Sequence, residues 1–253
     1  GVGAVVTYDK AIATSKGGSL TNLDAALSLA YHLGLDKNNK YHIGLGLQGI
    51  YTNKSINSDF TFEEELFATP TYLDDANLNA TPQHIFDMGA GIFLDGKITK
   101  TTTMFLGYSA NHLLTPKDDF IADSSSVSKT PMRHVANIGA EIELTKFIFM
   151  PGALFQTTAS ANEINFGLTG GYKLIDKPGK NTKLFLGLWS RIHASKGISS
   201  FALIPKLGVD FENFRVSGAY DIGLGTMSKD SKSATNVNRI PTSFEIALNY
   251  FGQ

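Results

Sequence analysis

The sequence predicts an all-β fold, an antiparallel transmembrane β-barrel, on the strength of three observations. Apolar and polar residues alternate through about twelve segments, as expected of strands with one apolar and one polar face. Most segments have about 10–14 residues, whereas ordinary strands have about 5–6 and about 9–11 tilted residues cross a bilayer. Every second connection between segments is short and polar, and most of the others are longer.

The expected strands follow one another along the chain with no amphipathic helix between them. In the second segment, for example, Leu23, Leu27 and Tyr31 share a face opposite Asp24 and Ser28. Successive side chains of a strand point to opposite sides, so such alternation separates an apolar face from a polar one. The expected strands are residues 1–9, 20–33, 40–53, 84–94, 101–113, 133–144, 147–158, 162–174, 182–193, 201–211, 214–224 and 242–251.

The stretch FALIPKLGVDFENFRVSGAYDIGLG, residues 201–225, shows one pair of these strands clearly. Apolar residues occupy most odd positions from Phe201 to Phe211 and most even positions from Phe214 to Leu224. The parity changes at Glu212–Asn213, which leaves room only for a tight turn. We therefore expect two long strands joined by a hairpin turn, each with one apolar face.

The lengths of the connections predict which end of each strand faces which side of a membrane. Outer-membrane barrels have short periplasmic turns and longer external loops, and aromatic residues gather near their strand ends. Alternation alone also fits a soluble sandwich with one solvated face, but Greek-key connections give no reason for short and long connections to alternate. The short connections are 34–39, 95–100, 145–146, 175–181 and 212–213; 10–19, 54–83, 114–132 and 225–241 are long, and 159–161 and 194–200 intermediate.

Composition excludes several other classes of protein. The net charge is -1 without a basic cluster, which argues against binding to nucleic acid. The chain has no cysteine, so disulfides and thiolate metal sites are excluded. No apolar run reaches the 18 or so residues of a transmembrane helix. The first residues already have the pattern of a strand, so we expect one barrel domain over residues 1–253 with a preceding N-terminal portion missing.

Charged residues on the polar faces are the first set of candidate functional residues. A barrel of this size cannot fill its lumen with apolar side chains alone, so these charges are expected to pair across strands or to line water. Two alternatives stay open, namely a lattice of ion pairs that plugs the lumen and a channel that conducts or holds a ligand. The candidates for lumen-facing charges are Glu141, Glu143, Lys206, Asp210, Arg215 and Asp221.

The connection over residues 55–83 is the second candidate. It is far longer than the 2–5 residues that usually close a hairpin, and it carries apolar side chains that would be costly to leave exposed. Either it folds over the barrel mouth as a lid or it binds a partner. The candidate partner-binding residues are Phe60, Phe62, Leu66, Phe67, Tyr72 and Leu73.

We expect no catalytic, cofactor-binding or metal-binding residues, and hence no enzyme. The GLGLQG stretch has the glycine spacing of a dinucleotide-binding turn, but it lies inside an expected strand with no helix after it. His32 and His42 flank one turn, yet no carboxylate accompanies them in sequence as a metal site would require. A hydrolase would need a serine, a histidine and an acidic residue, and Ser109 near His112 is the only local candidate.

Several blocks of the sequence together resemble a known family. They include GVGAVVTYDK, LTNLDAALSLAYHLGLDKNNKYHIGLGLQGIYTNKSI, FDMGAGIF, FLGYSANHLLTP, RHVANIGAEIELTKFIFMPGALFQ, LFLGLWSRI, ALIPKLGVDFENFRVSGAYDIGLG and SFEIALNYF. In this order they resemble the PorP/SprF family of type IX secretion system outer-membrane proteins from Bacteroidetes-type bacteria, over nearly the whole chain. Family members begin with a further segment, which would bring the complete barrel to about fourteen strands, an even number as in single-chain bacterial barrels.

The resemblance implies a location in the bacterial outer membrane and a role in protein secretion, cell-surface adhesin export and gliding motility. The implied partners are secreted substrates with a C-terminal sorting domain, other type IX secretion components, and outer-membrane lipid or lipopolysaccharide, with no nucleic acid and no cofactor. The alternative function is an outer-membrane transport channel for small or hydrophobic solutes.

Overall fold

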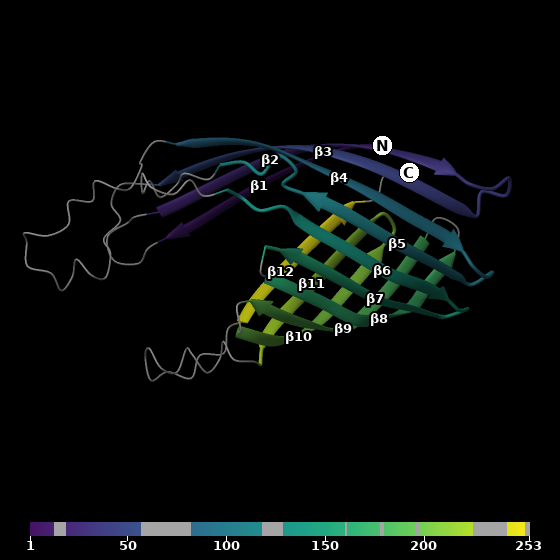
Figure 1. Cartoon of the computed structure of the whole chain (residues 1–253). Coiled ribbons are helices and arrows are strands. Elements are labelled where there is room, and N and C mark those ends of the chain that lie inside the picture. Colours follow the sequence, from purple (N-terminus) through teal and green to yellow (C-terminus); the bar gives the residue numbers. More distant parts are fainter. Residues whose placement is uncertain are drawn as a thin grey trace, which may run out of the picture. The chain divides into compact units, whose positions relative to one another are not determined.

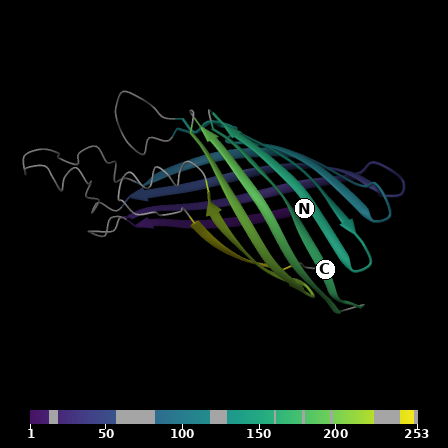
Figure 2. The same cartoon turned by 90° about the horizontal axis from the view of Figure 1, so that it is seen from below.

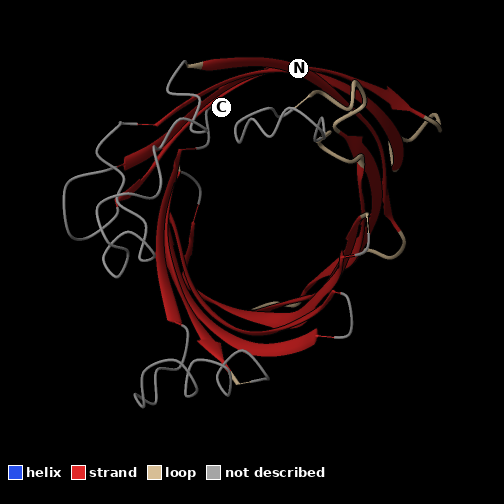
Figure 3. Cartoon of the chain, turned by 60° about the vertical axis from the view of Figure 1, so that its left-hand side comes forward, coloured by secondary structure: helices blue, strands red, loops and turns tan. Residues whose placement is uncertain are grey.

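The computed structural model of the chain describes residues 1–12, 19–56, 82–117, 129–159, 161–177, 180–195, 198–224 and 242–250. These residues form strands joined by turns, with no helix among them (Figure 3). In particular, the described part of the chain has no helix that is long and apolar enough to cross a membrane.

Twelve strands form one sheet in which the order of the strands in space is their order in the sequence (Figure 1). This topology needs only hairpin connections. The strands are β1 (Val2–Ile12), β2 (Ser19–Gly34), β3 (Tyr41–Ile56), β4 (Gln83–Lys97), β5 (Thr102–Asn111), β6 (Arg133–Glu143), β7 (Phe147–Thr158), β8 (Ala161–Lys177), β9 (Lys180–Ser195), β10 (Ile198–Phe211), β11 (Phe214–Gly223) and β12 (Thr242–Tyr250).

All the strands expected from alternation are confirmed, but several connections are shorter than expected, including those at 10–19 and 175–181, where pairing continues to Ile12↔Ser19 and Lys177↔Lys180. The pairing of β7 with β8 continues to Thr158 and Ala161, and that of β9 with β10 continues to Ser195 and Ile198. Backbone pairing therefore extends past the last clearly alternating side chains. As a result, the connections expected to be intermediate at 159–161 and 194–200 are tight, and the alternation of short and long connections is incomplete.

Contacts divide the chain into two compact units, the first comprising residues 1–32, 45–91 and 110–132. In this unit β1 pairs with β2 from Val2↔Leu29 to Ile12↔Ser19. The hydroxyl of Thr52 donates a hydrogen bond to Asp24, which joins the polar residues of β3 and β2. Four residues further along each strand, the amide of Gln48 donates to the Ser28 hydroxyl at 2.9 Å.

The second unit comprises residues 33–44, 92–109 and 133–253. In it β6 to β12 lie side by side in chain order, as the green to yellow strands of Figure 2 show. Register is continuous along β9 and β10, from Thr182↔Phe211 to Ser195↔Ile198. This continuity fixes which side chains of neighbouring strands share a face, because a shift of one residue would move them all to the other face.

Two turns of the second unit show how local sequence sets the hairpins. Asn39 closes the β2–β3 turn with a φ of 52°, in the left-handed region that asparagine tolerates better than most residues. Glu212 begins the β10–β11 turn with a φ of 53°, and its amide donates a hydrogen bond to the Asn181 carbonyl at 2.8 Å. The turn predicted at Glu212–Asn213 is therefore confirmed.

Candidate functional site

The second unit has an apolar face and a polar face, defined by the register of its strands. The apolar face carries Leu186, Leu188, Leu207 and Val216, which are 63%, 58%, 54% and 51% exposed. The polar face carries the alternate residues, where side chains from neighbouring strands cover one another. Its buried members include Ile148, Phe185 and Ala202. Nothing in the described chain covers the apolar face, and exposed apolar area on this scale is unusual for a soluble monomer.

All the predicted lumen-facing charges of the second unit lie on this polar face. Lys206, Asp210, Arg215 and Asp221 lie on β10 and β11, where Asp210 is directly opposite Arg215. Glu141 and Glu143 lie on β6. The register connects Glu143 to β10 on the same face through Ile148, Gly171, Phe185 and Gly208. The structure therefore places the predicted charges on one face. That this face lines a lumen stays a prediction.

Three of the predicted charges are paired with a charged residue of another strand. Arg215 binds the Asp210 carboxylate from Nε at 2.5 Å and from Nη2 at 2.8 Å. Lys173 lies 2.6 Å from a carboxylate oxygen of Glu143. These contacts join β10 to β11 and β6 to β8, so ion pairs link strands that are not all adjacent in the sheet.

Asp221 makes a longer connection across the sheet. Its carboxylate accepts a hydrogen bond from Arg191 of β9, although β10 lies between β9 and β11. The buried Ala202 of β10 is paired with Arg191, and its small side chain leaves the space over which the two charged side chains meet. Sequence reasoning named Asp221 but missed its partner, because 30 residues separate the two.

An aromatic pocket of about 270 Å³ lies on the same polar face. The ammonium of Lys206 is 4.6 Å from the centre of the Trp189 ring, and the Arg215 guanidinium is 5.0 Å from the centre of Phe185. Trp189 donates from Nε1 to the Thr169 hydroxyl at 3.0 Å. The two aromatic rings are thus each beside a cation, which is the favourable geometry of a cation–π contact.

Glycines make room for the indole ring of Trp189. A side-chain carbon on Gly167 of β8 would lie 2.6 Å from Trp189 Cγ, and one on Gly152 of β7 would lie 2.9 Å from Trp189 Cη2. The ring therefore extends from β9 across two neighbouring strands. Large rings that lie over glycines of the next strand compensate for the missing side chains there.

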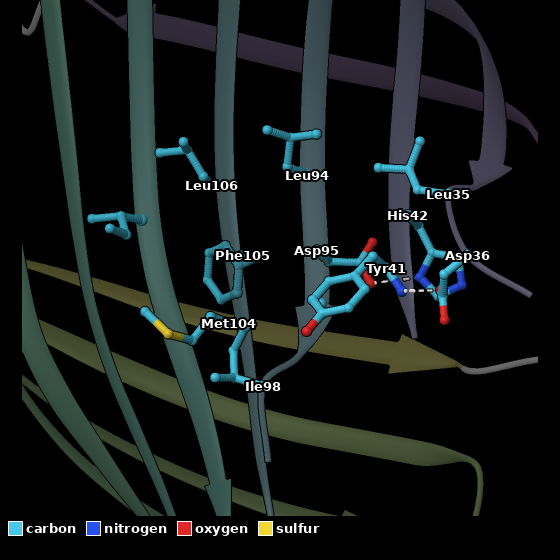
Figure 4. A pocket seen from close by; sticks show the side chains of 12 residues that line it. Leu35, Asp36, Tyr41, His42, Leu94, Asp95, Ile98, Met104, Phe105 and Leu106 are labelled. Atoms are coloured by element: carbon cyan, nitrogen blue, oxygen red, sulfur yellow. Dashed lines mark hydrogen bonds and ion pairs between the residues drawn. The ribbon is translucent and has the colours of Figure 1, made fainter. Parts of the chain in front are cut away.

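A second concave site, an apolar groove of about 600 Å³, lies on the apolar face at the short-turn end of β3 to β6. Figure 4 shows Leu106, Leu94 and Leu35 in one row and Met104, Ile98 and Tyr41 in a second row. Gly96 leaves space for the Tyr41 ring, since a side-chain carbon at this position would overlap it. We call this site the apolar groove.

The turn that borders the apolar groove is built around Asp36. Its Oδ1 accepts hydrogen bonds from the backbone amides of Lys40 at 2.7 Å and Tyr41 at 2.9 Å, and its Oδ2 accepts one from Asn38 at 3.1 Å. The amide of Tyr41, and to a smaller extent those of Lys40 and Asn38, hold the pKa of the Asp36 carboxyl below its ordinary value. Partial desolvation opposes this effect, and the charge of Lys40 adds to it.

Two histidine–aspartate pairs were missed by sequence reasoning. His42 Nδ1 lies 2.9 Å from Asp95 on the polar face of β3 and β4. His112 Nδ1 lies 2.5 Å from Asp87, a buried carboxylate that also accepts from the Met88 amide at 2.7 Å. The members of each pair are 53 and 25 residues apart, so no local motif indicates them.

The described ranges hold no cluster of three or more histidine, cysteine, aspartate or glutamate side chains with the geometry of a metal site. The candidate partner-binding residues Phe60, Phe62, Leu66, Phe67, Tyr72 and Leu73 lie outside the described residues. Their proposed role therefore stays a prediction.

Comparison with known proteins identifies the family and supports the fold. The sequence model of a family described as "Type IX secretion system membrane protein PorP/SprF" matches residues 1–250. No curated protein matches the sequence.

Solved structures of similar fold are outer-membrane proteins. An outer membrane channel from Pseudomonas putida F1 superposes with a TM-score of 0.50 at 12% identity, covering 98% of this chain and 91% of that chain. The beta domain of the Bordetella autotransporter Brka has a TM-score of 0.41 at 12% identity, covering 98% of this chain and 96% of that one. The likeness to the channel concerns the fold alone. With the twelve antiparallel strands, it confirms the predicted fold class of an outer-membrane β-barrel.

Proposed function

Because the chain belongs to the PorP/SprF family of type IX secretion system membrane proteins, we propose that it is a barrel that binds export cargo, connects periplasmic machinery to the outer membrane, or both. Its location in the bacterial outer membrane follows from the family and from the fold. The proposed cargo is an adhesin-like protein with a C-terminal sorting domain. The observation that carries the proposal is the family match over residues 1–250.

The topology supports different functions for the two ends of the strands. Consecutive strands are antiparallel neighbours, so alternate connections leave from opposite edges of the sheet. Three connections that leave from one edge have more than the 2–5 residues of a usual hairpin loop, namely β3–β4, β5–β6 and β11–β12. We assign cargo binding to that edge and contact with periplasmic components to the edge of short turns. This role requires no catalysis, cofactor or metal.

Replacement of residues 58–80 with a short Gly/Ser linker tests the assignment of cargo binding. The barrel strands end at Ile56 and begin again at Gln83, so the linker leaves every described strand residue in place. We expect heat-modifiable migration of the folded barrel to be retained while export of the cargo and its co-purification fall. A matched variant that shortens residues 225–241 shows whether the effect is particular to the first connection. Undiminished export and co-purification would remove residues 58–80 from the mechanism.

A second candidate function is transport of a small or hydrophobic solute. The aromatic pocket beside Trp189 favours it, because a cavity lined by aromatic rings, two cations and two hydroxyl groups is suited to hold a ligand. Conductance in planar bilayers distinguishes the two functions. Lys206→Ala is expected to change the conductance of a channel and to leave the binding of a cargo at the external edge unchanged.

A further inference from the structure

The apolar groove lies where an outer-membrane lipid would meet the protein. Its walls are apolar side chains of the face that nothing in the described chain covers, and it lies at the short-turn end of the strands. Leu35, Met104 and Leu106 are 61%, 41% and 50% exposed, so the groove opens outward from the sheet and not between covered layers. An occupant of this site must be apolar and must approach from the membrane.

The carboxylates at the groove are already engaged by the protein. Asp36 accepts hydrogen bonds from three backbone amides of its own turn. Asp95, which also lines the groove, is held by His42 at 2.9 Å. Both carboxylates therefore already have hydrogen-bond or ion-pair partners within the protein.

Exposed lysines lie in and next to the two turns that adjoin the groove. The amide of Lys97 donates a hydrogen bond to the Lys40 carbonyl at 2.9 Å, which places these two residues side by side at the ends of β4 and β3. Lys37 and Lys100, in the two adjacent turns, are exposed, as are Lys40 and Lys97. An exposed lysine is a mobile point charge on a flexible stem, which suits a phosphate group better than a fixed protein partner.

We propose, from the outer-membrane location and independently of the export role, that the apolar groove binds one anionic phospholipid of the periplasmic leaflet. An acyl chain lies between the row of Leu35, Leu94 and Leu106 and the row that includes Met104. The headgroup phosphate contacts the lysines of the adjacent turns. Basic side chains beside an apolar membrane-facing groove are the usual basis of recognition of anionic lipid headgroups. An apolar protein helix would fill the walls equally well, but it would offer no anionic group to the exposed Lys37 and Lys100.

Native mass spectrometry of the detergent-solubilised, refolded chain tests the proposal with two probes, dioleoylphosphatidylglycerol and dioleoylphosphatidylcholine. Met104→Trp fills the groove, and Leu188→Trp on the same apolar face is its matched control. We expect wild type and Leu188→Trp to retain one phosphatidylglycerol preferentially, and the retained fraction to fall about tenfold in Met104→Trp, equivalent to about 1.4 kcal/mol. Met104→Phe serves as the filling variant if the tryptophan variant does not give heat-modifiable folded protein.

A triple variant, Lys37→Gln with Lys40→Gln and Lys100→Gln, tests the headgroup contact separately. Retention of phosphatidylglycerol is expected to fall to that of phosphatidylcholine, while phosphatidylcholine retention stays as in wild type. Equal retention by Met104→Trp and Leu188→Trp would overturn the acyl-chain site. An unchanged preference for phosphatidylglycerol in the triple variant would overturn the headgroup assignment. Neither readout depends on export, so failure here is distinguishable from failure of the proposed secretion role.

Discussion

The guanidinium of Arg215 on β11 holds the carboxylate of Asp210 on β10 through two hydrogen bonds, at 2.5 Å and 2.8 Å. The two residues are directly opposite in the antiparallel pair, and only the tight turn separates their strands. The Asp210 side chain is 14% exposed and that of Arg215 is 37% exposed. This bidentate geometry is more favourable than a single contact between flexible chains, so the pair fixes the hairpin at its polar face.

Asp210→Asn is expected to lower the free energy of unfolding by about 1–2 kcal/mol, because it leaves a partly buried guanidinium without its charged partner. We expect no larger loss of stability, because water reaches the partly exposed Arg215 side chain and weakens its attraction to Asp210. Urea unfolding of the refolded barrel in detergent measures the change. Glu212→Gln is the control, because it removes one exposed carboxylate from the adjacent turn and should change the free energy of unfolding by less than about 0.5 kcal/mol. An equal loss in both variants would contradict a special role for the β10–β11 pair.

Gly167→Ala is expected to displace Trp189 and to lower the free energy of unfolding by about 1–3 kcal/mol. The added carbon would lie 2.5 Å from the Leu188 carbonyl oxygen and 2.6 Å from Trp189 Cγ, so the strand or the ring must move. Trp189 is the only tryptophan of the chain, and its emission spectrum therefore reports the displacement directly. In Gly170→Ala the nearest atom is 3.9 Å away, and this control should keep the wild-type emission and stability.

A positive charge on the apolar face of β9 should disturb assembly far more than one on the polar face of β11. Leu186 is 63% exposed near the middle of its strand, so Leu186→Arg places the charge in lipid at a cost of about 2–4 kcal/mol. Ser217→Arg adds the same side chain to the polar face, where water or carboxylates can compensate it. The fraction of heat-modifiable folded barrel in membranes is the measurement. Equal assembly of the two variants would show that the assignment of the faces is wrong.

The Asp36 turn is expected to weaken in acid. The pKa of Asp36 is lower in the folded turn than in the unfolded chain, so its contribution to stability is complete above its ordinary pKa of 3.8. That contribution is lost as the pH falls through the folded pKa. Amide hydrogen exchange at Lys40 and Tyr41 should therefore show lower protection on acidification, once the intrinsic pH dependence of exchange is taken out. Asp36→Asn should remove this additional pH dependence, and its persistence in that variant would assign it to another group.

The strands could be predicted because their signal is local. Side chains of one strand alternate between lipid and polar surroundings, so the sequence of residues 201–211 alone shows both faces of β10. The turn at Glu212–Asn213 could be predicted for the same reason. The tight connection after Thr158 could not, because small polar residues around it lack alternation although the backbone still pairs there.

The candidate site could be predicted only in part, because its contacts depend on register between distant segments. The sequence shows that Asp221 lies on a polar face, but not that Arg191 reaches it across the small side chain of Ala202. Likewise, His42 has no acidic neighbour in sequence, and its partner Asp95 is 53 residues away on β4. The apolar groove forms where the Tyr41 ring lies against Gly96, which has no side chain. These two residues are on different strands, so no single segment of the sequence indicates the groove.

Single cysteines introduced at the two edges of the sheet should react on opposite sides of the outer membrane. The chain has no cysteine of its own, so each introduced thiol gives an unambiguous signal with a membrane-impermeant maleimide. Asn38→Cys and Thr99→Cys lie in short turns, whereas Lys117→Cys and Lys129→Cys lie on the connection between β5 and β6, and all these positions are exposed. Consecutive antiparallel strands put the first pair at one edge and the second pair at the other.

On intact cells we expect labelling of Lys117→Cys and Lys129→Cys and no labelling of Asn38→Cys and Thr99→Cys, because short turns of outer-membrane barrels face the periplasm. Permeabilisation of the outer membrane should make the turn cysteines reactive as well, which controls for thiols that are hidden by the fold. Lys117 and Lys129 form an isolated antiparallel bridge, so their two cysteines should behave alike. The reverse pattern would invert the orientation. The apolar groove and the lysines of the adjacent turns would then lie at the external leaflet. That result would also rule out the proposed phospholipid of the periplasmic leaflet.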